Sequence, residues 1–168
     1  MSDNPVAIVT GGSRGVGAAT ARMLSENGWN VVITCSSSVK DADQVAKNCT
    51  NENAEVVALQ ADVSKDLECI ATINKAIEKW GRIDALINNA GTTKVAWDHS
   101  DLDSLTAEDF QYIYGVNVVG PFQMVKAAKE HLLKSANPCV VNISSIAGIK
   151  GIGSSVAYAS SKGALNTM

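Results

Sequence analysis

The stretch from residue 5 to residue 28 constrains the fold more than any other part of the chain. Residues 5–10 (PVAIVT) form a short apolar, β-branched run, which predicts a buried strand. A glycine-rich turn follows at residues 11–17, and residues 18–27 carry apolar positions at helical spacing before Gly28. Glycines allow a tight turn and close approach to a phosphate, and a helix N-terminus offers free N–H groups. The stretch therefore predicts a nucleotide-binding α/β unit.

Further apolar runs continue the same alternation along the chain. They predict strands at residues 30–35, 55–60, 85–87 and 139–143, and helical patterns lie between them at 40–53, 64–80 and 107–133. Ser64 is expected to cap the second of these helices, and Thr106 with Asp109 to form a capping box at the third. Alternating strands and helices predict βαβ units and a parallel sheet.

The end of the second predicted strand bears on the choice of cofactor. An acidic residue there would bind the ribose 2′-hydroxyl of NAD. The chain instead has Cys35 followed by Ser36, Ser37 and Ser38, and Arg14 lies in the preceding turn. Hydroxyls and a guanidinium suit a 2′-phosphate, although the serines could also form an ordinary turn and Arg14 could be a solvated cation. We therefore expect NADP, with NAD as the less favoured alternative.

The candidate chemistry lies between Ser145 and Lys162. Tyr158 and Lys162 are four residues apart, so both lie on one face if the segment is helical. An ammonium about 4 Å from a phenol can lower the pKa of the phenol toward the range useful for proton transfer. Ser145 follows the fifth predicted strand, at the edge where open α/β sheets bind ligands. The Tyr-x-x-x-Lys spacing also occurs by chance in many helices, so the other motifs must decide.

Two further polar residues have competing interpretations. Asn117 lies inside the helical pattern of residues 107–133, close to Pro121. An asparagine beside a proline predicts a kink with a functional purpose, and the alternative is a structural asparagine with satisfied hydrogen bonds. His99 lies beside Trp97 in a polar loop and either faces the substrate or is simply solvated.

Composition and charge exclude several classes of function. The 168 residues are 46% apolar and 18% charged, with a net charge of −3 and scattered basic residues, so we expect no nucleic-acid or anionic-membrane surface. No apolar run is long enough to span a bilayer, and the N-terminus lacks the features of a signal peptide, so we expect a cytoplasmic protein. The four cysteines form no CxxC pair and only two histidines are present, so we expect neither a disulfide framework nor a metal site.

Taken together, the motifs resemble those of the short-chain dehydrogenase/reductase family. The turn at residues 10–17 matches its TGxxxGxG pattern, Asp62 and Val63 match its adenine-contacting pair, and residues 88–91 match its NNAG motif. The family's catalytic tetrad corresponds to Asn117, Ser145, Tyr158 and Lys162. The resemblance implies a Rossmann-type doubly wound α/β fold, in a single dinucleotide-binding domain over residues 1–168.

Within this family the chain is most similar to NADPH-dependent 3-oxoacyl-[acyl-carrier-protein] reductases and their carbonyl-reductase relatives. The resemblance implies hydride transfer between nicotinamide and a carbonyl or secondary alcohol. The segment between Gly91 and Asn117 is slightly longer than in typical 3-oxoacyl reductases, which weakens the case for an acyl-carrier substrate. The expected substrate is therefore a 3-oxoacyl thioester or a small ketone. The alternatives of another class are a non-catalytic NADP-binding regulator and a scaffold protein with the same fold.

The same resemblance implies roles for individual residues. Tyr158 would exchange the proton, and Lys162 would tune Tyr158 and hydrogen-bond the nicotinamide ribose. Ser145 would hold the substrate oxygen, and Asn117 would hold a water that links Lys162 to solvent. Cofactor binding is expected at Tyr158, Lys162 and residues of the earlier motifs: Gly11, Gly12, Ser13, Arg14, Gly15, Val16, Gly17, Ser36, Ser37, Asp62, Val63, Asn89, Ala90 and Gly91.

The family resemblance also bears on partners and on completeness. Family members commonly form dimers or tetramers through two long helices, here those with Asn117 and Tyr158, so we expect a homodimer or homotetramer. Members of the family also continue well past the equivalent of Met168, with two further strands and a loop over the substrate. We therefore expect residues 1–168 to represent a longer enzyme without its last strands and substrate loop.

Overall fold

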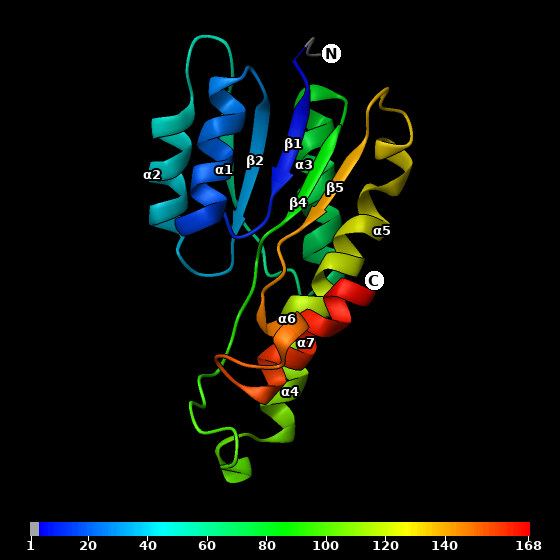
Figure 1. Cartoon of the computed structure of the whole chain (residues 1–168). Helices are drawn as coiled ribbons and strands as arrows, with labels where there is room; N and C mark the ends of the chain where they lie inside the picture. The colour runs from blue at the N-terminus through cyan, green and yellow to red at the C-terminus, as the bar shows by residue number, and fades with distance from the viewer. Residues whose placement is uncertain (1–3) are drawn as a thin grey trace.

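The computed structural model describes residues 4–168, and five parallel strands form its sheet. They are β1 (Val6–Val9), β2 (Asn30–Cys35), β3 (Val56–Gln60), β4 (Ala85–Asn88) and β5 (Cys139–Asn142). The strands lie in the order β3-β2-β1-β4-β5, as Figure 1 shows. Every neighbouring pair is parallel, as predicted. The bounds of the five strands agree with the predicted ranges to within one residue at either end.

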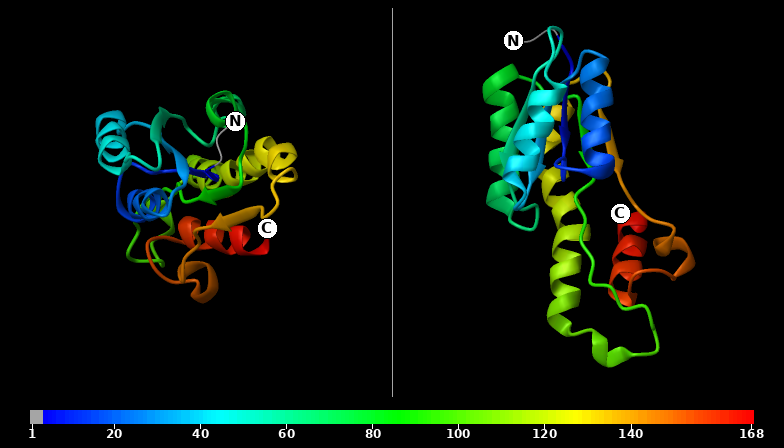
Figure 2. Two further views of the ribbon diagram at one scale, coloured as in Figure 1. Left: turned by 90° about the horizontal axis from the view of Figure 1, so that it is seen from above. Right: turned by 90° about the vertical axis from the view of Figure 1, so that its left-hand side faces the viewer.

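Helices cover both faces of this sheet. One face carries α1 (Gly15–Glu26) and α2 (Val39–Cys49), and the other carries α3 (Asp66–Trp80) and α5 (Gly120–Leu132) (Figures 1 and 2). Alternate residues of β1 enter the two cores, because Val6 and Ile8 pack toward α3 and α5 while Ala7 and Val9 pack toward α1 and α2. A parallel sheet buried on both faces in this way is doubly wound. The predicted Rossmann-type α/β fold is therefore confirmed.

Two predicted helix boundaries are wrong. The helix predicted at residues 40–53 ends at Cys49, because Asn51 Oδ1 accepts hydrogen bonds from the Asn53 and Ala54 N–H groups at 2.8 and 3.0 Å and forms a turn. Ser64 does not cap α3, which begins at Asp66 without a side-chain cap.

Residues around Ser64 make other bonds instead. The Ser64 hydroxyl donates to Asp62 Oδ1 at 2.7 Å, and Glu68 Oε2 accepts from the Asp62 N–H at 2.7 Å. Asp62 therefore closes the turn between β3 and α3, which holds the following Val63 at the carboxyl end of β3.

The helical pattern at residues 107–133 consists of three pieces. They are α4 (Ala107–Tyr114), the π-helical segment η2 (Gly115–Val119) and α5. A short 3-10 helix, η1 (Leu102–Ser104), lies before α4. The predicted capping box is confirmed, since Thr106 Oγ1 accepts from the Asp109 N–H and Asp109 Oδ2 accepts from the Thr106 N–H. The π-helical segment contains Asn117, where the kink was predicted.

Two helices follow β5. They are the short α6 (Ala147–Lys150), which the sequence pattern did not predict, and α7 (Val156–Thr167), which contains Tyr158 and Lys162. Figure 1 shows both beyond the carboxyl end of β5, where α7 packs against α6 and α4. The strand β5 is an edge strand here, and its Val140 and Val141 side chains are partly exposed. Within residues 4–168, none of the helices has the length and apolar character needed to cross a membrane.

Asp84, at the amino end of β4, is a buried carboxylate that joins several elements. It accepts hydrogen bonds from the Val6 N–H at 2.9 Å, from Arg82 Nε and Nη2 at 2.8 Å each, and from the Ser135 hydroxyl at 2.6 Å. Burial by itself raises the pKa of Asp84, but the bonds from Arg82, Ser135 and Val6 outweigh it and hold the pKa below its ordinary value.

Asp84→Asn is expected to lower the free energy of unfolding by about 2 kcal/mol at neutral pH, because donors to the carboxylate lose their charged acceptor. A depressed folded-state pKa means that this contribution is fully present above the unfolded-state pKa of about 3.9 and is lost as the pH falls through the folded-state pKa. Denaturant unfolding over a range of pH should show that the difference in free energy of unfolding between wild type and Asp84→Asn becomes smaller in acid. Asp103→Asn is the control, because Asp103 is exposed. A difference in free energy of unfolding that does not change with pH would contradict this account.

Candidate active site

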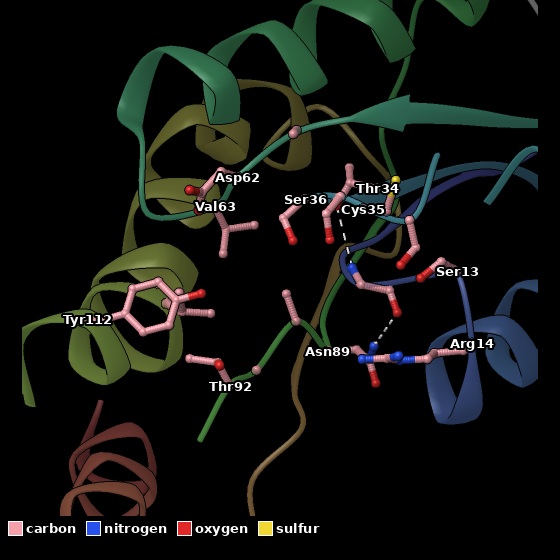
Figure 3. Close-up of a pocket in the computed structure, with 17 residues that line it drawn as sticks. Ser13, Arg14, Thr34, Cys35, Ser36, Asp62, Val63, Asn89, Thr92 and Tyr112 are labelled. Atoms are coloured by element: carbon pink, nitrogen blue, oxygen red, sulfur yellow. Dashed lines mark hydrogen bonds between the residues drawn. The ribbon is translucent and has the colours of Figure 1, made fainter. Parts of the chain in front are cut away.

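A cleft of about 430 Å³ lies at the carboxyl ends of the strands. The chain turns to opposite sides of the sheet from β1 and β4, so this is the edge where open α/β sheets bind ligands. Ten of the predicted cofactor residues line the cleft (Figure 3): Gly11, Ser13, Arg14, Ser36, Ser37, Asp62, Val63, Asn89, Ala90 and Gly91.

Three glycines of the turn lie where a Cβ would collide with neighbouring atoms. Gly17, in the first turn of α1, lies so close to the backbone that a Cβ would come within 2.4 Å of the Gly11 carbonyl oxygen. Gly11 has a φ of +67°, which favours glycine, and a Cβ there would lie 2.9 Å from Ala90 Cα. Gly12 packs against Ile33 of β2 in the same way. Gly15 and Val16 begin α1, so the helix N-terminus follows the turn directly.

Asn89, the residue directly after β4, holds the glycine turn in place. Its Nδ2 donates to the Thr10 and Gly11 carbonyl oxygens at 2.8 and 3.0 Å. The buried Thr10 hydroxyl oxygen in turn accepts from the Asn89 and Ala90 N–H groups, both at 3.0 Å. These four bonds tie the turn after β1 to the segment after β4, so the two motifs form one rigid wall of the cleft.

The opposite part of the cleft contains the end of β2. Ser36 and Ser37 line it together with Cys35, whose thiol pKa is raised by burial and further by Asp43 and Asp41. Cys35 is therefore a neutral thiol and leaves no carboxylate at the position that would select NAD. In Figure 3, Arg14 lies on the turn after β1, at the opposite end of the cleft from Tyr112.

A second cleft of about 560 Å³ adjoins the first. It shares Arg14, Asn89, Gly91 and Thr92 with the first cleft, and its other lining residues include Thr93, Ile143, Ser144, Ser154, Tyr158 and Lys162. The structure thus brings the predicted tyrosine and lysine to the end of the predicted cofactor cleft. The glycine turn and the Tyr158 helix are far apart in the sequence, so their meeting here is a tertiary feature.

Lys162 is buried beside Tyr158. Its side chain is only 4% exposed, and Nζ donates to the Ile143 carbonyl oxygen at 2.7 Å. Nζ lies 5.9 Å from the centre of the Tyr158 ring, as the spacing of four residues on α7 predicted. Burial lowers the pKa of Lys162, because it disfavours the charged form of the amine.

Asn117 is fully buried at the centre of the π-helical segment η2. Its Oδ1 accepts from the Thr92 N–H at 2.8 Å, and its Nδ2 donates to the Thr92 carbonyl oxygen and to the Ser161 hydroxyl, both at 2.9 Å. Ser161 also donates to the Tyr158 carbonyl oxygen at 2.7 Å. The side chain thus satisfies its own hydrogen bonds and links the loop after β4 to α7, one residue from Lys162.

The two serines after β5 occupy different places. Ser144 lines the second cleft, and its hydroxyl bonds to Asn166 Oδ1 and to the Lys162 carbonyl oxygen. Ser145 Oγ accepts from the Ala147 N–H at 3.1 Å, at the beginning of α6. Ser145 is not among the residues that line either cleft, and its role as holder of the substrate oxygen stays a prediction.

The structure adds residues that the sequence motifs left out. Thr34 Oγ1 accepts from the Gly11 N–H at 3.4 Å, and Tyr112 of α4 lines the cleft near Asp62 and Val63. Thr34 could have been found from its place at the end of β2, but the orientation of Tyr112 depends on how α4 packs. His99, by contrast, lines a separate hollow of about 190 Å³ with apolar residues and lies outside both clefts.

The model of the family described as short chain dehydrogenase matches residues 5–168 of the chain. The chain belongs to the short-chain dehydrogenase/reductase family. The resemblance inferred from the glycine turn, the NNAG motif and the Tyr158–Lys162 spacing is therefore confirmed. This short-chain dehydrogenase/reductase also matches named relatives and solved structures over nearly its whole length.

Two relatives and one structure illustrate the similarity. The chain is 42% identical over 159 residues to a ketoacyl reductase of the granaticin polyketide synthase from Streptomyces violaceoruber, covering 95% of the chain and 62% of that protein. It is 36% identical over 157 residues to a 3-oxoacyl-[acyl-carrier-protein] reductase from Synechocystis, covering 94% of the chain and 62% of that protein. A short-chain dehydrogenase/reductase structure from Burkholderia xenovorans superposes with a TM-score of 0.94 at 42% identity, covering 99% of the chain and 70% of that structure.

Proposed function

We propose that the full-length protein is an NADP(H)-dependent oxidoreductase that transfers a hydride between nicotinamide and a carbonyl or secondary alcohol. Its substrate is a 3-oxoacyl thioester or a small ketone. The observation that carries the proposal is the junction of two clefts, one with the glycine turn and Arg14, the other with Tyr158 and Lys162. Relatives named as ketoacyl and 3-oxoacyl reductases support the substrate class.

The residues of the first cleft fit a nicotinamide dinucleotide. Side-chain atoms are excluded at Gly11 and Gly17, because a Cβ there would lie within 3 Å of backbone atoms, so a pyrophosphate can approach the bare backbone. The N-terminus of α1 follows and favours negative charge. Val63 offers an apolar contact for adenine at the end of β3, with Asp62 beside it as a hydrogen-bond acceptor. When bound, the cofactor supplies the hydride for the carbonyl carbon.

Tyr158 and Lys162 of the second cleft, together with Ser145 and Asn117 outside its lining, handle the proton and orient the substrate. Tyr158 donates its phenolic proton to the substrate oxygen in reduction and accepts it in oxidation. Lys162, one turn along α7, favours the phenolate form of Tyr158 and hydrogen-bonds the nicotinamide ribose. Ser145 hydrogen-bonds the substrate oxygen as charge develops on it. Asn117 uses both Nδ2 hydrogens in bonds to Thr92 and Ser161, so the water that connects Lys162 to solvent is held by the second lone pair of Asn117 Oδ1.

A non-catalytic regulator or a scaffold protein would use the same fold differently. Neither needs a tyrosine and a buried lysine in one cleft, because binding a dinucleotide requires only the glycine turn and the residues around it. The enzyme is therefore the better account of Tyr158 and Lys162.

The choice of NADP over NAD gives a test of the first cleft. Arg14→Ala is expected to weaken NADPH binding about tenfold or more and to leave NADH binding nearly unchanged, because a charge-assisted bond to the 2′-phosphate is lost. Cys35→Asp is expected to move the preference toward NADH, because a carboxylate at the end of β2 accepts from ribose hydroxyls and repels a phosphate. Both are measured as dissociation constants by fluorescence titration.

Arg22→Ala is the control for this test, because Arg22 is an exposed cation on α1 outside the lining of both clefts. Equal losses of NADPH and NADH affinity in Arg14→Ala, or tighter binding of NADH by wild type, would contradict NADP selectivity.

A homodimer or homotetramer through α4, α5 and α7 is also proposed. Apolar side chains on α5 and next to it support this proposal, since Phe122 is 56% exposed and Leu133 is 68% exposed. A cytoplasmic location likewise stays a prediction.

A further inference from the structure

Two hydroxyl groups meet at the rim of the second cleft. Thr93 Oγ1, in the loop after β4, lies 2.5 Å from Ser154 Oγ, in the loop before α7. A second bond reinforces the junction, because the Ala96 N–H donates to the Ser154 carbonyl oxygen at 2.7 Å. Segments 61 residues apart in the sequence are thereby joined beside Tyr158.

The backbone at Ser154 is held in an unusual conformation. Its φ is +60°, and it is the only residue other than glycine with a positive φ among residues 4–168. Such a conformation costs on the order of 1 kcal/mol for a serine and persists where the surroundings enforce it. The next residue, Ser155, is buried and accepts from the Tyr158 N–H at 3.2 Å, which begins α7. The strained residue thus presents its hydroxyl to Thr93 immediately before the helix that carries Tyr158.

The two hydroxyls leave one proton for a ligand. Each hydroxyl supplies one proton, and one of the two is used in their mutual bond. The competing acceptor, the Lys94 carbonyl oxygen, lies at 3.4 Å from Thr93 Oγ1, which is a long bond. Both residues line the cleft with Tyr158 and Lys162. The pair is therefore suited to donate one hydrogen bond to a neutral acceptor inside this cleft.

We propose that Thr93 and Ser154 form a substrate-recognition pair, which donates one hydrogen bond to a neutral acceptor next to the carbonyl that is reduced. The inference rests on the proposed reductase function and extends it to a preference between its two substrate classes. A 3-oxoacyl thioester carries a second carbonyl two carbons from the reacting one, whereas a simple ketone has no such acceptor. The pair therefore favours the 3-oxoacyl thioester.

The test compares kcat/KM of the full-length protein, at saturating NADPH, for a 3-oxoacyl thioester and for a simple ketone of similar size. Thr93→Val keeps the shape of the side chain and removes one hydroxyl. The Ser154 hydroxyl keeps its own proton, but it loses the bond to Thr93 that orients this proton into the cleft. Thr93→Val is expected to lower kcat/KM about threefold to tenfold for the thioester and to leave the ketone nearly unchanged. Thr93→Ser retains a hydroxyl and is expected to keep the wild-type preference.

Ser154 offers an independent pair of variants. Ser154→Gly removes the hydroxyl but accepts the positive φ, so it should reproduce the loss of preference without lowering Tm. Ser154→Ala also removes the hydroxyl and keeps the backbone strain, so it should show the same loss of preference at a lower Tm than Ser154→Gly. If Thr93→Val fails to fold, Ser154→Gly carries the test.

Equal losses for thioester and ketone in these variants would overturn the inference, since the pair would then only join the two loops. An unchanged preference would overturn it as well. Absence of turnover by the wild-type protein with every carbonyl substrate would be a different result, because it would overturn the proposed function itself.

Discussion

Tyr158→Phe is expected to lower kcat for carbonyl reduction by about a thousandfold and to leave the dissociation constant of NADPH within about twofold of wild type. The phenolic proton is the one that the proposed chemistry transfers, and general acid–base groups contribute about 10²- to 10⁴-fold to rates. Tyr158 lines only the second cleft, whereas Gly11 and Ser13 of the glycine turn line only the first. Steady-state kinetics and cofactor titration of the same preparation measure both effects.

Tyr114→Phe is the matched control for this variant. Tyr114 ends α4 and lines neither cleft, so the same loss of a hydroxyl should leave kcat unchanged. Near-normal turnover by Tyr158→Phe would show that the proton comes from another group. A parallel loss of NADPH affinity would show that Tyr158 mainly binds the cofactor.

Gly17→Ala is expected to weaken NADPH binding about a hundredfold and to lower the free energy of unfolding by about 3 kcal/mol. The new Cβ would lie 2.4 Å from the Gly11 carbonyl oxygen and 2.5 Å from Asn89 Nδ2. Neither group can retreat easily, because Asn89 Nδ2 donates to the carbonyl oxygens of Thr10 and Gly11. The turn must therefore move away from α1, and the backbone N–H groups facing the cleft move with it.

Gly15→Ala provides the comparison for this substitution. Gly15 has a φ of +56°, but a Cβ there meets no atom within 4 Å, so only backbone strain of about 1 kcal/mol is expected. Cofactor titration and denaturant unfolding of both variants separate strain from collision. Equal effects of the two substitutions would contradict the explanation by close contact.

The order of strands and helices could be predicted from the sequence because burial imposes it locally. The strands β1 and β2 are short β-branched runs buried on both faces, and such runs are visible without tertiary information. Helix ends were less predictable, because they depend on side-chain hydrogen bonds. The Asn51 side chain forms the turn that follows α2, and the Ser64 hydroxyl bonds to Asp62 instead of capping α3. The short α6 left no periodic pattern to recognise.

The candidate site also contains parts that could be predicted from the sequence and parts that could not. Many residues that line the first cleft come from short contiguous motifs, and Gly11 and Gly17 leave no room for a Cβ, so sequence spacing alone could predict this cleft. The Thr93–Ser154 pair and the orientation of Tyr112 arise only when distant segments meet, and threonine, serine and tyrosine are common in ordinary loops and helices. The sequence shows Asn117 as a polar residue inside a helical pattern, close to Pro121. Its bonds to Thr92 and Ser161 could not be predicted, because they depend on the packing of α7 against η2.

The central claim is that the full-length protein transfers a hydride from NADPH to a carbonyl carbon in the cleft of Tyr158 and Lys162. The most direct test uses NADPH deuterated at the transferable hydrogen, a 3-oxoacyl thioester, and mass spectrometry of the product. We expect the deuterium on the new alcohol carbon with wild type and a loss of about a thousandfold in its rate of appearance with Tyr158→Phe. Tight NADPH binding by wild type without any deuterium in the product, across thioesters and ketones, would contradict the claim.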